Sequence, residues 1–337
     1  MRHKFAEFAL FLVSLALVLA LVDRGVFWLM SRPPKAYPAS SLAGRLVKNS
    51  FNFRDYEYPR EKADGVFRVL AIGDSFTAGV GVNFDDVWPK RLERYLAAYS
   101  NVAGVRYQVL NLGVAGAGTP GDLDRARKFS GEFRPDLIVV GYCMNDSEDE
   151  ADRAGVISLR KRTSHIELAK GGRLSTWLFD HWTLYRFVRV RLFNTRKNRG
   201  QVDYYHAIYR DDYPGWIKAR AAIAELGEFR KESGIPVVML IFPLFSWNQD
   251  ENYPFADEHA RLNAQLEKAG LPYVDLRAAY RGLEHATLEA VPFVDPHPND
   301  IAQRIAAEQL YRFLAGGELL PKGEKPSASF SLPPPWP

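Results

Sequence analysis

From residue 67 onward, short and mostly apolar runs alternate with amphipathic stretches. The apolar runs are four to seven residues long and do not strictly alternate with polar residues, which is typical of strands buried on both faces of a sheet. The amphipathic stretches space their apolar residues as one face of a helix does. The expected strands are Phe67–Ile72, Tyr107–Leu112, Leu137–Tyr142, Pro236–Phe242 and Tyr273–Leu276, and the expected helices are Val87–Tyr99, Gly121–Phe133, Ile217–Ser233, Phe255–Ala269 and Ile301–Leu314.

Regular alternation of strands and helices predicts a parallel sheet covered by helices on both faces. In such α/β sheets, functional residues gather at the carboxyl ends of the strands. We place this main domain at residues 65–315, with an insertion at 148–214 where the alternation stops. Residues 31–64 are rich in proline, tyrosine and charge and show no sustained periodicity, so we expect a linker with some local structure. Residues 316–337 end in Pro-Pro-Pro-Trp-Pro and predict a disordered tail.

The N-terminus predicts a membrane anchor. Residues 1–4 are basic, and Phe8–Val22 is a run of 15 residues without a charge. With its apolar neighbours the run reaches the short end of a membrane-spanning helix. Trp28 follows and is suited to the far membrane interface. We therefore expect an uncleaved signal anchor or transmembrane helix over residues 1–30, which crosses the cytoplasmic membrane once.

A basic start is expected to remain inside, so the rest of the chain would be extracytoplasmic, either periplasmic or extracellular. The alternative is a cleaved signal peptide, because Val18-x-Ala20 offers a small-residue cleavage site. Either alternative exports the main domain. A buried core helix would also be apolar, but the run is apolar all round and follows a basic start.

Composition excludes several classes of protein. The chain is 47% hydrophobic and 25% charged, which is typical of a globular protein and excludes collagen-like, coiled-coil and wholly disordered chains. A net charge of +4 is too small for a polybasic nucleic-acid binder. Cys143 is the only cysteine, which excludes an intramolecular disulfide framework and a Cys-rich zinc site. No two histidines have metal-ligand spacing, so we expect no metal and no cofactor.

Positive charge is concentrated in the insertion. From Arg153 to Gly200 there are 12 Lys or Arg residues against two acidic ones, a net charge of +10. The same segment carries aromatic residues at Trp177–Trp182 and Tyr185–Phe193. Basic and aromatic residues together favour an amphipathic element that lies on an anionic membrane surface or faces a polyanionic substrate. The alternative is an ordinary cap with a solvated basic rim.

Gly73-Asp74-Ser75 follows the first expected strand. A serine that ends a parallel strand and enters a helical turn exposes its hydroxyl at the sheet edge, beside backbone N–H groups able to stabilise an oxyanion. Ser75 is therefore a candidate nucleophile, and Asp74 is expected to hydrogen-bond within the turn rather than act as an acid. The tripeptide alone arises readily by chance. The Gly-x-Ser-x-Gly elbow of α/β-hydrolases is absent from the chain.

Three further features follow strands in the same way. Asn111–Gly116 comes after the second strand, Asn145 after the third, and His297 precedes the last helix. A glycine lets a backbone N–H approach a ligand closely, an asparagine amide donates to an oxyanion, and a histidine is a general base. Each has a structural alternative. Gly116 is able to serve only as a turn residue and Asn145 only as a turn cap, and the segment before the last helix is able to serve only to supply an N-cap, Asn299 or Asp300. Their order and the topology together make this set of residues specific.

On these residues the sequence resembles the SGNH superfamily of hydrolases, also called the GDSL family. The resemblance covers residues 65–315 without the insertion, and its blocks match at Gly73-Asp74-Ser75, Asn111–Gly116, Asn145-Asp146 and Asp295–His297. It implies a flavodoxin-like α/β/α sandwich with a mainly parallel five-stranded sheet. It also implies Ser75 as nucleophile, His297 as general base and Asp295 as the group that orients the base. The implied oxyanion hole consists of the Ser75 N–H, the Gly116 N–H and the Asn145 side chain.

The last block departs from the family pattern, which usually spaces the pair Asp-x-x-His. Here Asp295 and His297 are two residues apart, and each precedes a proline that favours extended backbone. Side chains at i and i+2 of an extended segment lie broadly on one side, so the carboxylate is within reach of His297 Nδ1. In the alternative, a backbone carbonyl orients His297 and Asp295 is a turn residue.

We therefore expect a serine esterase that acts outside the cytoplasmic membrane on O-acyl groups of a carbohydrate or cell-envelope polymer. An acyltransferase with the same triad is the first alternative, because it differs only in the acceptor. A lipase or phospholipase is the second, favoured if the insertion docks on a bilayer. A non-enzymatic envelope protein that binds glycan is the alternative from another class. The expected partners are an ester substrate, such as an acylated polysaccharide or lipid, and the membrane; no nucleic-acid-binding motif is visible.

Overall fold

The computed structural model describes residues 10–11, 14–15, 17–25, 28, 48–100, 102–148, 172–291 and 295–321. The chain divides into two compact units. The larger, here the α/β unit, consists of Leu42–Asp149 and Tyr204–Pro337. The smaller, here the N-terminal unit, consists of Met1–Ser41 and Glu150–Asp203.

A five-stranded, fully parallel sheet forms the centre of the α/β unit, in the order β2-β1-β3-β4-β5. β1 lies inside the sheet, next to the edge; the chain adds β2 on one side of it and then returns to add β3, β4 and β5 on the other. At such a reversal the loops beyond the carboxyl ends of the strands separate and leave room for a site. The strands are β1 (Val66–Gly73), β2 (Arg106–Gly113), β3 (Leu137–Cys143), β4 (Val237–Phe242) and β5 (Tyr273–Asp275), which confirms the predicted five strands.

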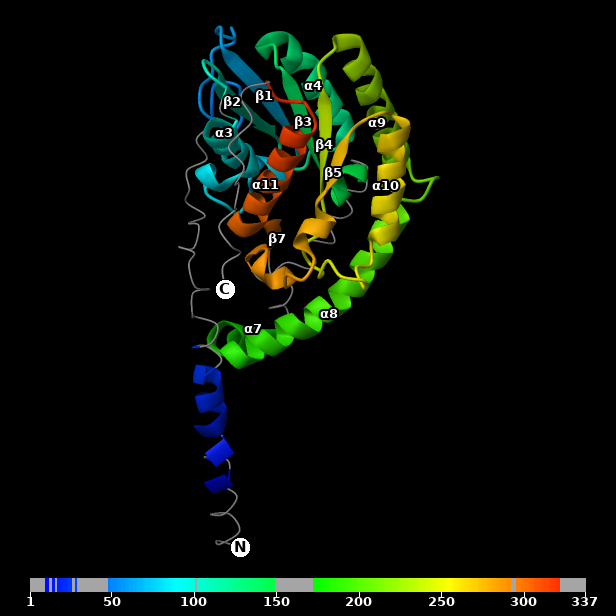
Figure 1. Ribbon diagram of the computed structural model, residues 1–337. Coiled ribbons are helices and arrows are strands. Elements are labelled where there is room, and N and C mark those ends of the chain that lie inside the picture. Colours follow the sequence, from blue (N-terminus) through cyan, green and yellow to red (C-terminus); the bar gives the residue numbers. More distant parts are fainter. Residues whose placement is uncertain are drawn as a thin grey trace, which may run out of the picture. The chain divides into compact units, whose positions relative to one another are not determined.

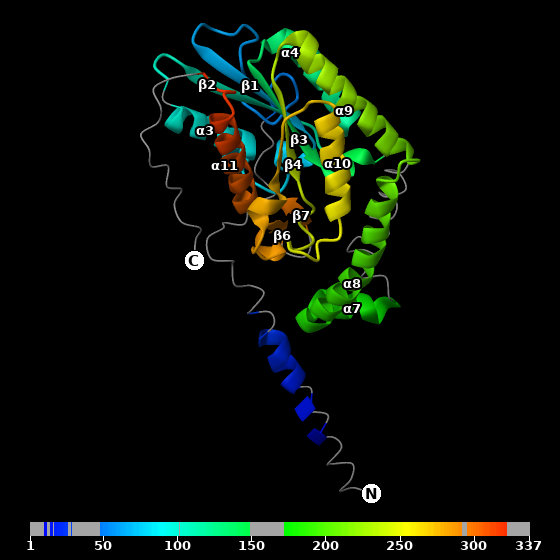
Figure 2. The same cartoon turned by 45° about the vertical axis from the view of Figure 1, so that its right-hand side comes forward.

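Helices cover both faces of the sheet (Figures 1 and 2). α3 (Trp88–Tyr99) and α11 (Asp300–Gly316) pack together on one face. α4 (Thr119–Phe133), α9 (Pro214–Ser233) and α10 (Ala256–Lys268) cover the other. The general preference for right-handed crossovers accounts for α3 on one face and α4, α9 and α10 on the other, because the connection from β1 to β2 runs in the opposite direction to the later ones. The predicted helices are all present.

Short elements at the carboxyl end of the sheet hold the residues of interest. α2 (Ser75–Ala78) is a single turn after β1, and the 3-10 turn Met144–Ser147 follows β3. An antiparallel pair, β6 (Glu289–Val291) and β7 (Asp295–Pro298), precedes α11. The sequence did not predict this pair, because strands of three and four residues are too short to show a period.

Residues 48–64 differ from the predicted linker. Phe53, Arg54 and Asp55 are buried in the α/β unit, and the Phe53 ring meets Phe129 of α4 edge-on at 5.3 Å. The segment forms no helix or strand, so it shows no hydrophobic period although it belongs to the core. Of the predicted tail, residues 322–337 lie outside the described part of the chain.

The N-terminal unit contains α7 (Gly172–His181) and most of α8 (Thr183–Ile208), both from the predicted insertion. Asp23, from the N-terminal helical residues, accepts a hydrogen bond from the Leu184 backbone N–H at 2.6 Å and so satisfies one free donor at the start of α8. Among the described residues, no helix is both long enough and apolar enough to span a membrane. The anchor at residues 1–30 lies partly outside those residues and stays a prediction.

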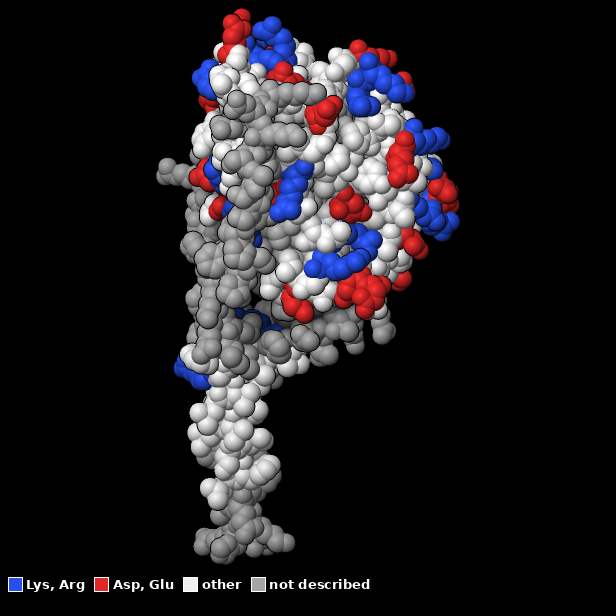
Figure 3. All heavy atoms as spheres, viewed as in Figure 1, with Lys and Arg blue, Asp and Glu red and all other residues white. Residues whose placement is uncertain are grey.

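Charged side chains of both signs are mixed over the face of the α/β unit in Figure 3. That face carries no large patch of one sign among the residues that the structure describes. Much of the predicted basic insertion, residues 149–171, lies outside the described part of the chain.

Candidate active site

Ser75 is placed by a tight turn at the end of β1. Gly73 has φ +154°, and a Cβ there would come within 2.6 Å of the Gly141 carbonyl oxygen, so the turn requires glycine. Asp74 is buried and caps α2, because its Oδ1 accepts a hydrogen bond from the Phe76 N–H at 2.8 Å. Ser75 is the first residue of α2 and lies at the carboxyl edge of the sheet, as its position in the sequence predicted.

His297 meets Ser75 from the far end of the chain. His297 Nε2 lies 3.1 Å from Ser75 Oγ, and His297 Nδ1 lies 2.5 Å from Asp295 Oδ1. With Nδ1 donating to the carboxylate, Nε2 is left to accept the hydroxyl hydrogen of Ser75. The three side chains therefore form a continuous serine–histidine–aspartate hydrogen-bond chain.

β7 gives Asp295 and His297 their geometry. Extended backbone turns both side chains to one side, and the His297 N–H also donates to Asp295 Oδ1 at 3.1 Å. The structure thus brings the carboxylate, rather than a backbone carbonyl, to the imidazole. The Phe76 ring packs edge-on against the His297 ring, with 5.6 Å between the ring centroids. The His297 side chain is 25% exposed and that of Asp295 is 34% exposed, so water reaches both.

Asp74 links the serine turn to Asn145. Burial raises the pKa of the Asp74 carboxyl, and hydrogen bonds from the Phe76 N–H and the Asn145 side chain, together with the charge of His297, act in the opposite direction. Ser75 Oγ also lies 3.4 Å from Asp74 Oδ2. Asp74 is therefore a structural acceptor of the turn, and the Asn145 side chain lies beside it.

The other predicted oxyanion donors follow neighbouring strands. Asn145 lies in the turn after β3, and Gly116 lies three residues beyond the end of β2. The Val114 N–H donates to the Gly73 carbonyl at 2.9 Å, which ties the loop that carries Gly116 to the end of β1. Gly116 has φ +79°, and a Cβ there would meet no heavy atom within 4 Å, so a ligand has room to approach this stretch of backbone.

Two features near the triad were not singled out from the sequence. Gly81 has φ +88°, and a Cβ there would lie 2.6 Å from Ala290 Cβ and 3.8 Å from His297 Cβ, so this loop packs closely on Ala290, beside the histidine. Arg54 comes from the predicted linker and binds the same loop. No local motif marks either residue, since their importance depends on contacts between distant segments.

The remaining nucleophile and histidine candidates have structural surroundings. Cys143 is buried, and burial raises the pKa of its thiol well above the usual value, which disfavours the reactive thiolate. Three other histidines pair with carboxylates, namely His206 with Glu258, His259 with Asp275 and His285 with Glu289. Over the described ranges, no group of three or more His, Cys, Asp or Glu side chains is arranged to hold a metal ion.

Comparison with known proteins identifies a family. The GDSL-like Lipase/Acylhydrolase family matches residues 71–305, more than half of the chain. Similar solved structures include TesA, with 18% identity, 75% of this chain and 99% of that chain covered, and a TM-score of 0.43. They also include Axe2, an acetylxylan esterase from Geobacillus stearothermophilus, with 16% identity, 73% of this chain and 93% of that chain covered, and a TM-score of 0.43.

LAE5, an alpha/beta hydrolase enzyme from the metagenome of Lake Arreo, Spain, is similar to a like degree, with 16% identity, 79% of this chain and 100% of that chain covered, and a TM-score of 0.45. No curated protein matches the chain.

Proposed function

The chain belongs to the GDSL-like lipase/acylhydrolase family and is an ester-bond hydrolase, and we propose that it is a serine esterase whose nucleophile is Ser75. The observation that carries this proposal is the hydrogen-bond chain in which His297 Nε2 lies 3.1 Å from Ser75 Oγ while Nδ1 lies 2.5 Å from Asp295. A serine hydroxyl is a weak nucleophile until an adjacent base accepts its proton, and this arrangement provides that base.

In the acylation step, His297 Nε2 accepts the Ser75 proton as Oγ attacks the ester carbonyl carbon. Asp295 holds the imidazole in the required tautomer and stabilises the positive charge that develops on it. His297 then returns the proton to the leaving alkoxide, and the acyl group remains on Ser75. The tetrahedral oxyanion is held by the backbone N–H groups of Ser75 and Gly116 and by the Asn145 side chain.

Deacylation follows the same steps with water as the nucleophile. His297 accepts a proton from the water as it attacks the acyl carbon, and then returns the proton to Ser75 Oγ as the acid leaves. The exposure of His297 and Asp295 supports this step, because water is able to approach the imidazole. Asp74 contributes by capping the turn that carries Ser75, because its Oδ1 accepts from the Phe76 N–H. Fixed donors of this kind stabilise developing charge without reorganising during the reaction.

For the natural substrate, we propose O-acyl groups on a carbohydrate or cell-envelope polymer outside the cytoplasmic membrane. The basic start and apolar run of the first 30 residues support export, and the concentration of positive charge in the insertion supports a polyanionic or membrane-bound partner. Leu10, Leu17 and Leu21 are each more than half exposed, which supports an apolar environment around the N-terminal helix.

Turnover of p-nitrophenyl acetate by the purified full chain tests the chemistry. Wild type is expected to hydrolyse this ester, and Ser75→Ala is expected to abolish the hydrolysis while remaining folded. Ser130→Ala is the matched control, because this serine lies on α4 and its hydroxyl bonds the Arg127 carbonyl. Equal turnover by wild type and Ser75→Ala would contradict the proposed nucleophile.

The acceptor is tested separately with an acetylated polysaccharide. Release of free acetate at the same rate with and without added sugar acceptor is the expected result for an esterase. Acetyl groups that appear on the added sugar in place of free acetate would identify an acyltransferase instead.

A further inference from the structure

Arg54 reaches the loop that follows the serine turn. It is buried, and its guanidinium donates to the backbone carbonyl groups of Ala78 at 3.3 Å, of Gly79 at close range and of Val82 at 2.7 Å. These acceptors lie at the end of α2 and on both sides of Gly81. One side chain thus bonds to both ends of the 79–82 loop.

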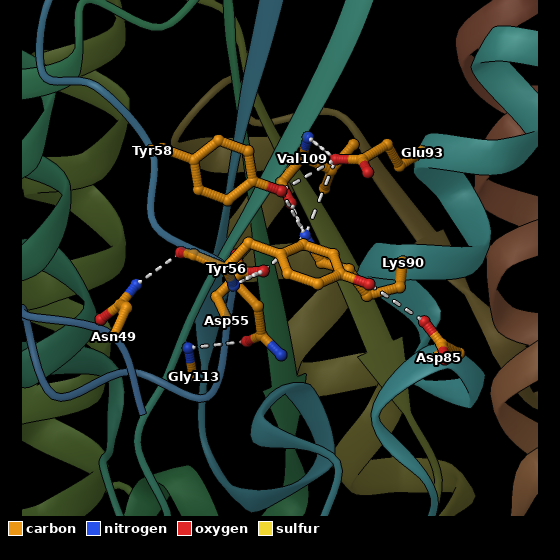
Figure 4. Close-up of polar contacts among 10 residues, drawn as sticks. Asn49, Asp55, Tyr56, Tyr58, Asp85, Lys90, Glu93, Val109 and Gly113 are labelled. Carbon is orange, nitrogen blue, oxygen red and sulfur yellow. Dashed lines mark hydrogen bonds and ion pairs between the residues drawn. The ribbon is translucent and has the colours of Figure 1, made fainter. Parts of the chain in front are cut away.

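A buried ion pair anchors the segment that carries Arg54 (Figure 4). The neighbouring Asp55 contacts Lys90 Nζ of α3 at 2.7 Å, and the two side chains are 1% and 3% exposed. Asp55 also accepts a hydrogen bond from the Asn111 N–H of β2 at 2.6 Å, and Lys90 donates to the Val109 carbonyl at 2.5 Å. The segment is therefore fixed to the rigid part of the sheet before Arg54 extends toward the loop.

The held loop packs on β6 beside the catalytic histidine. A Cβ on Gly81 would lie 2.6 Å from Ala290 Cβ, 3.8 Å from His297 Cβ and 4.0 Å from Asp295 Oδ2, so the Gly81 backbone lies close to Ala290 and near both catalytic residues. Gly79 and Val82, whose carbonyls bind Arg54, flank Gly81 in the chain. A shift of the loop would therefore alter the packing around Ala290 and His297.

We propose that Arg54 is a positioning residue for the reaction at Ser75: it fixes the 79–82 loop so that the loop keeps His297 aligned with Ser75 Oγ. The inference rests on the proposed function of Ser75 and His297. Arg54 acts through the loop and does not touch the reacting atoms. The segment 48–58 that supplies it lies before residues 71–305, where the family match is found.

Arg68 is a matched control for the loss of a buried arginine. It is fully buried and donates to the Arg60 carbonyl at 3.0 Å and the Phe133 carbonyl at 2.9 Å, so it makes bonds of the same kind as Arg54. It lies near the amino end of β1, at the opposite end of the sheet from Ser75. We therefore expect its removal to lower stability without disturbing the site.

The test compares kcat and KM for p-nitrophenyl acetate with thermal unfolding, in full-length wild type, Arg54→Met, Arg54→Lys and Arg68→Met. We expect Arg54→Met to lower kcat about 10- to 100-fold, the effect of a small misplacement of a catalytic group, with KM little changed. Arg68→Met is expected to lower the unfolding temperature but to keep the wild-type kcat below that temperature. Arg54→Lys keeps the charge but not the two-sided donor geometry, so its kcat is expected to lie between those of wild type and Arg54→Met.

Wild-type kcat in the folded Arg54→Met and Arg54→Lys variants would overturn the inference, as would an equal loss of kcat in Arg68→Met. If Arg54→Met does not fold, Arg54→Lys alone decides, since wild-type kcat there excludes a positioning role. The proposed function fails in a different way, namely when wild-type turnover persists in Ser75→Ala. The two failures are therefore separate observations.

Discussion

In two histidine–aspartate pairs of the α/β unit, the histidine Nδ1 contacts the aspartate carboxylate in the same way, but the surroundings of the two pairs differ. His297 Nδ1 lies 2.5 Å from Asp295, and His259 Nδ1 lies 3.1 Å from Asp275 at the end of β5. His297 is 25% exposed and its Nε2 reaches the Ser75 hydroxyl, whereas His259 is 1% exposed and its Nε2 has no hydrogen-bond partner within the described structure. A pair of this kind becomes a candidate catalytic unit only when the second nitrogen meets a nucleophile that substrate is able to reach.

The buried pair has the properties of a structural contact. Burial acts to raise the pKa of Asp275, but the hydrogen bond and charge of His259 and the Arg277 N–H outweigh it, so the pKa is lowered. Asp275 also accepts from the Arg277 N–H at 3.0 Å and so caps the 3-10 turn after β5. The pair joins α10 to the end of β5, and its contacts are those of a structural pair rather than of a catalytic one.

The largest expected difference between the pairs is the loss of each histidine. His297→Ala is expected to lower kcat for p-nitrophenyl acetate on the order of 10⁴-fold or more, because Ser75 loses its base. His259→Ala is the matched control, and its kcat is expected to remain near that of wild type although its unfolding temperature falls. Similar losses of kcat in the two variants would remove the distinction between the pairs.

Asp295→Asn is expected to lower kcat about 10⁴-fold, since the amide favours the wrong tautomer of His297 and does not stabilise its charged form. Circular dichroism and thermal unfolding are expected to match wild type, because Asp295 is partly exposed. Unchanged kcat would mean that Asp295 is a turn residue and that another group orients the base.

Asn145→Ala tests the oxyanion side of the same site. Loss of one oxyanion donor costs about 10²–10³ in rate, and we expect a kcat loss of that size with the fold retained. The measurement is kcat and KM for p-nitrophenyl acetate beside an unfolding curve. Full activity in this variant would exclude Asn145 from the site and leave it as a partner of Asp74 alone.

The smallest expected effect on activity comes from Asp275→Asn, which is expected to leave kcat unchanged and to lower the free energy of unfolding by about 1–3 kcal/mol. The folded pKa of Asp275 lies below its ordinary value of 3.8, so its charged form stabilises the protein above that pH, and this stabilisation is lost as the pH falls through the folded pKa. The difference in unfolding temperature between wild type and Asp275→Asn should therefore be full at pH 7 and shrink below about pH 4. A constant difference across this range would contradict the account of the pair.

The sequence predicted the elements whose environment is regular. β1, β3 and β4 are buried almost throughout and so appear as apolar runs, whereas the edge strands β2 and β5 are only partly buried. Ser75 and Asn145 follow the ends of β1 and β3. The short β6–β7 pair and the segment around Arg54 were missed, because neither has a period and both are defined by contacts with residues far away in the chain. The Asp295–His297 contact was predictable because two prolines restrict the backbone between neighbouring residues.

The meeting of Ser75 with His297 is a different kind of prediction, since 222 residues separate them. Only the order of the strands brings these two residues together. That order was predicted from the family resemblance and not from any local pattern in the sequence.

The most direct test of the central claim is covalent labelling with a serine-reactive organophosphate, diethyl p-nitrophenyl phosphate, followed by peptide mapping. The account predicts one diethylphosphoryl adduct, on Ser75, whose formation parallels the loss of esterase activity and becomes very slow in His297→Ala but not in His259→Ala. An adduct on another residue, or loss of activity without an adduct on Ser75, would contradict the assignment of Ser75 and His297 as nucleophile and base.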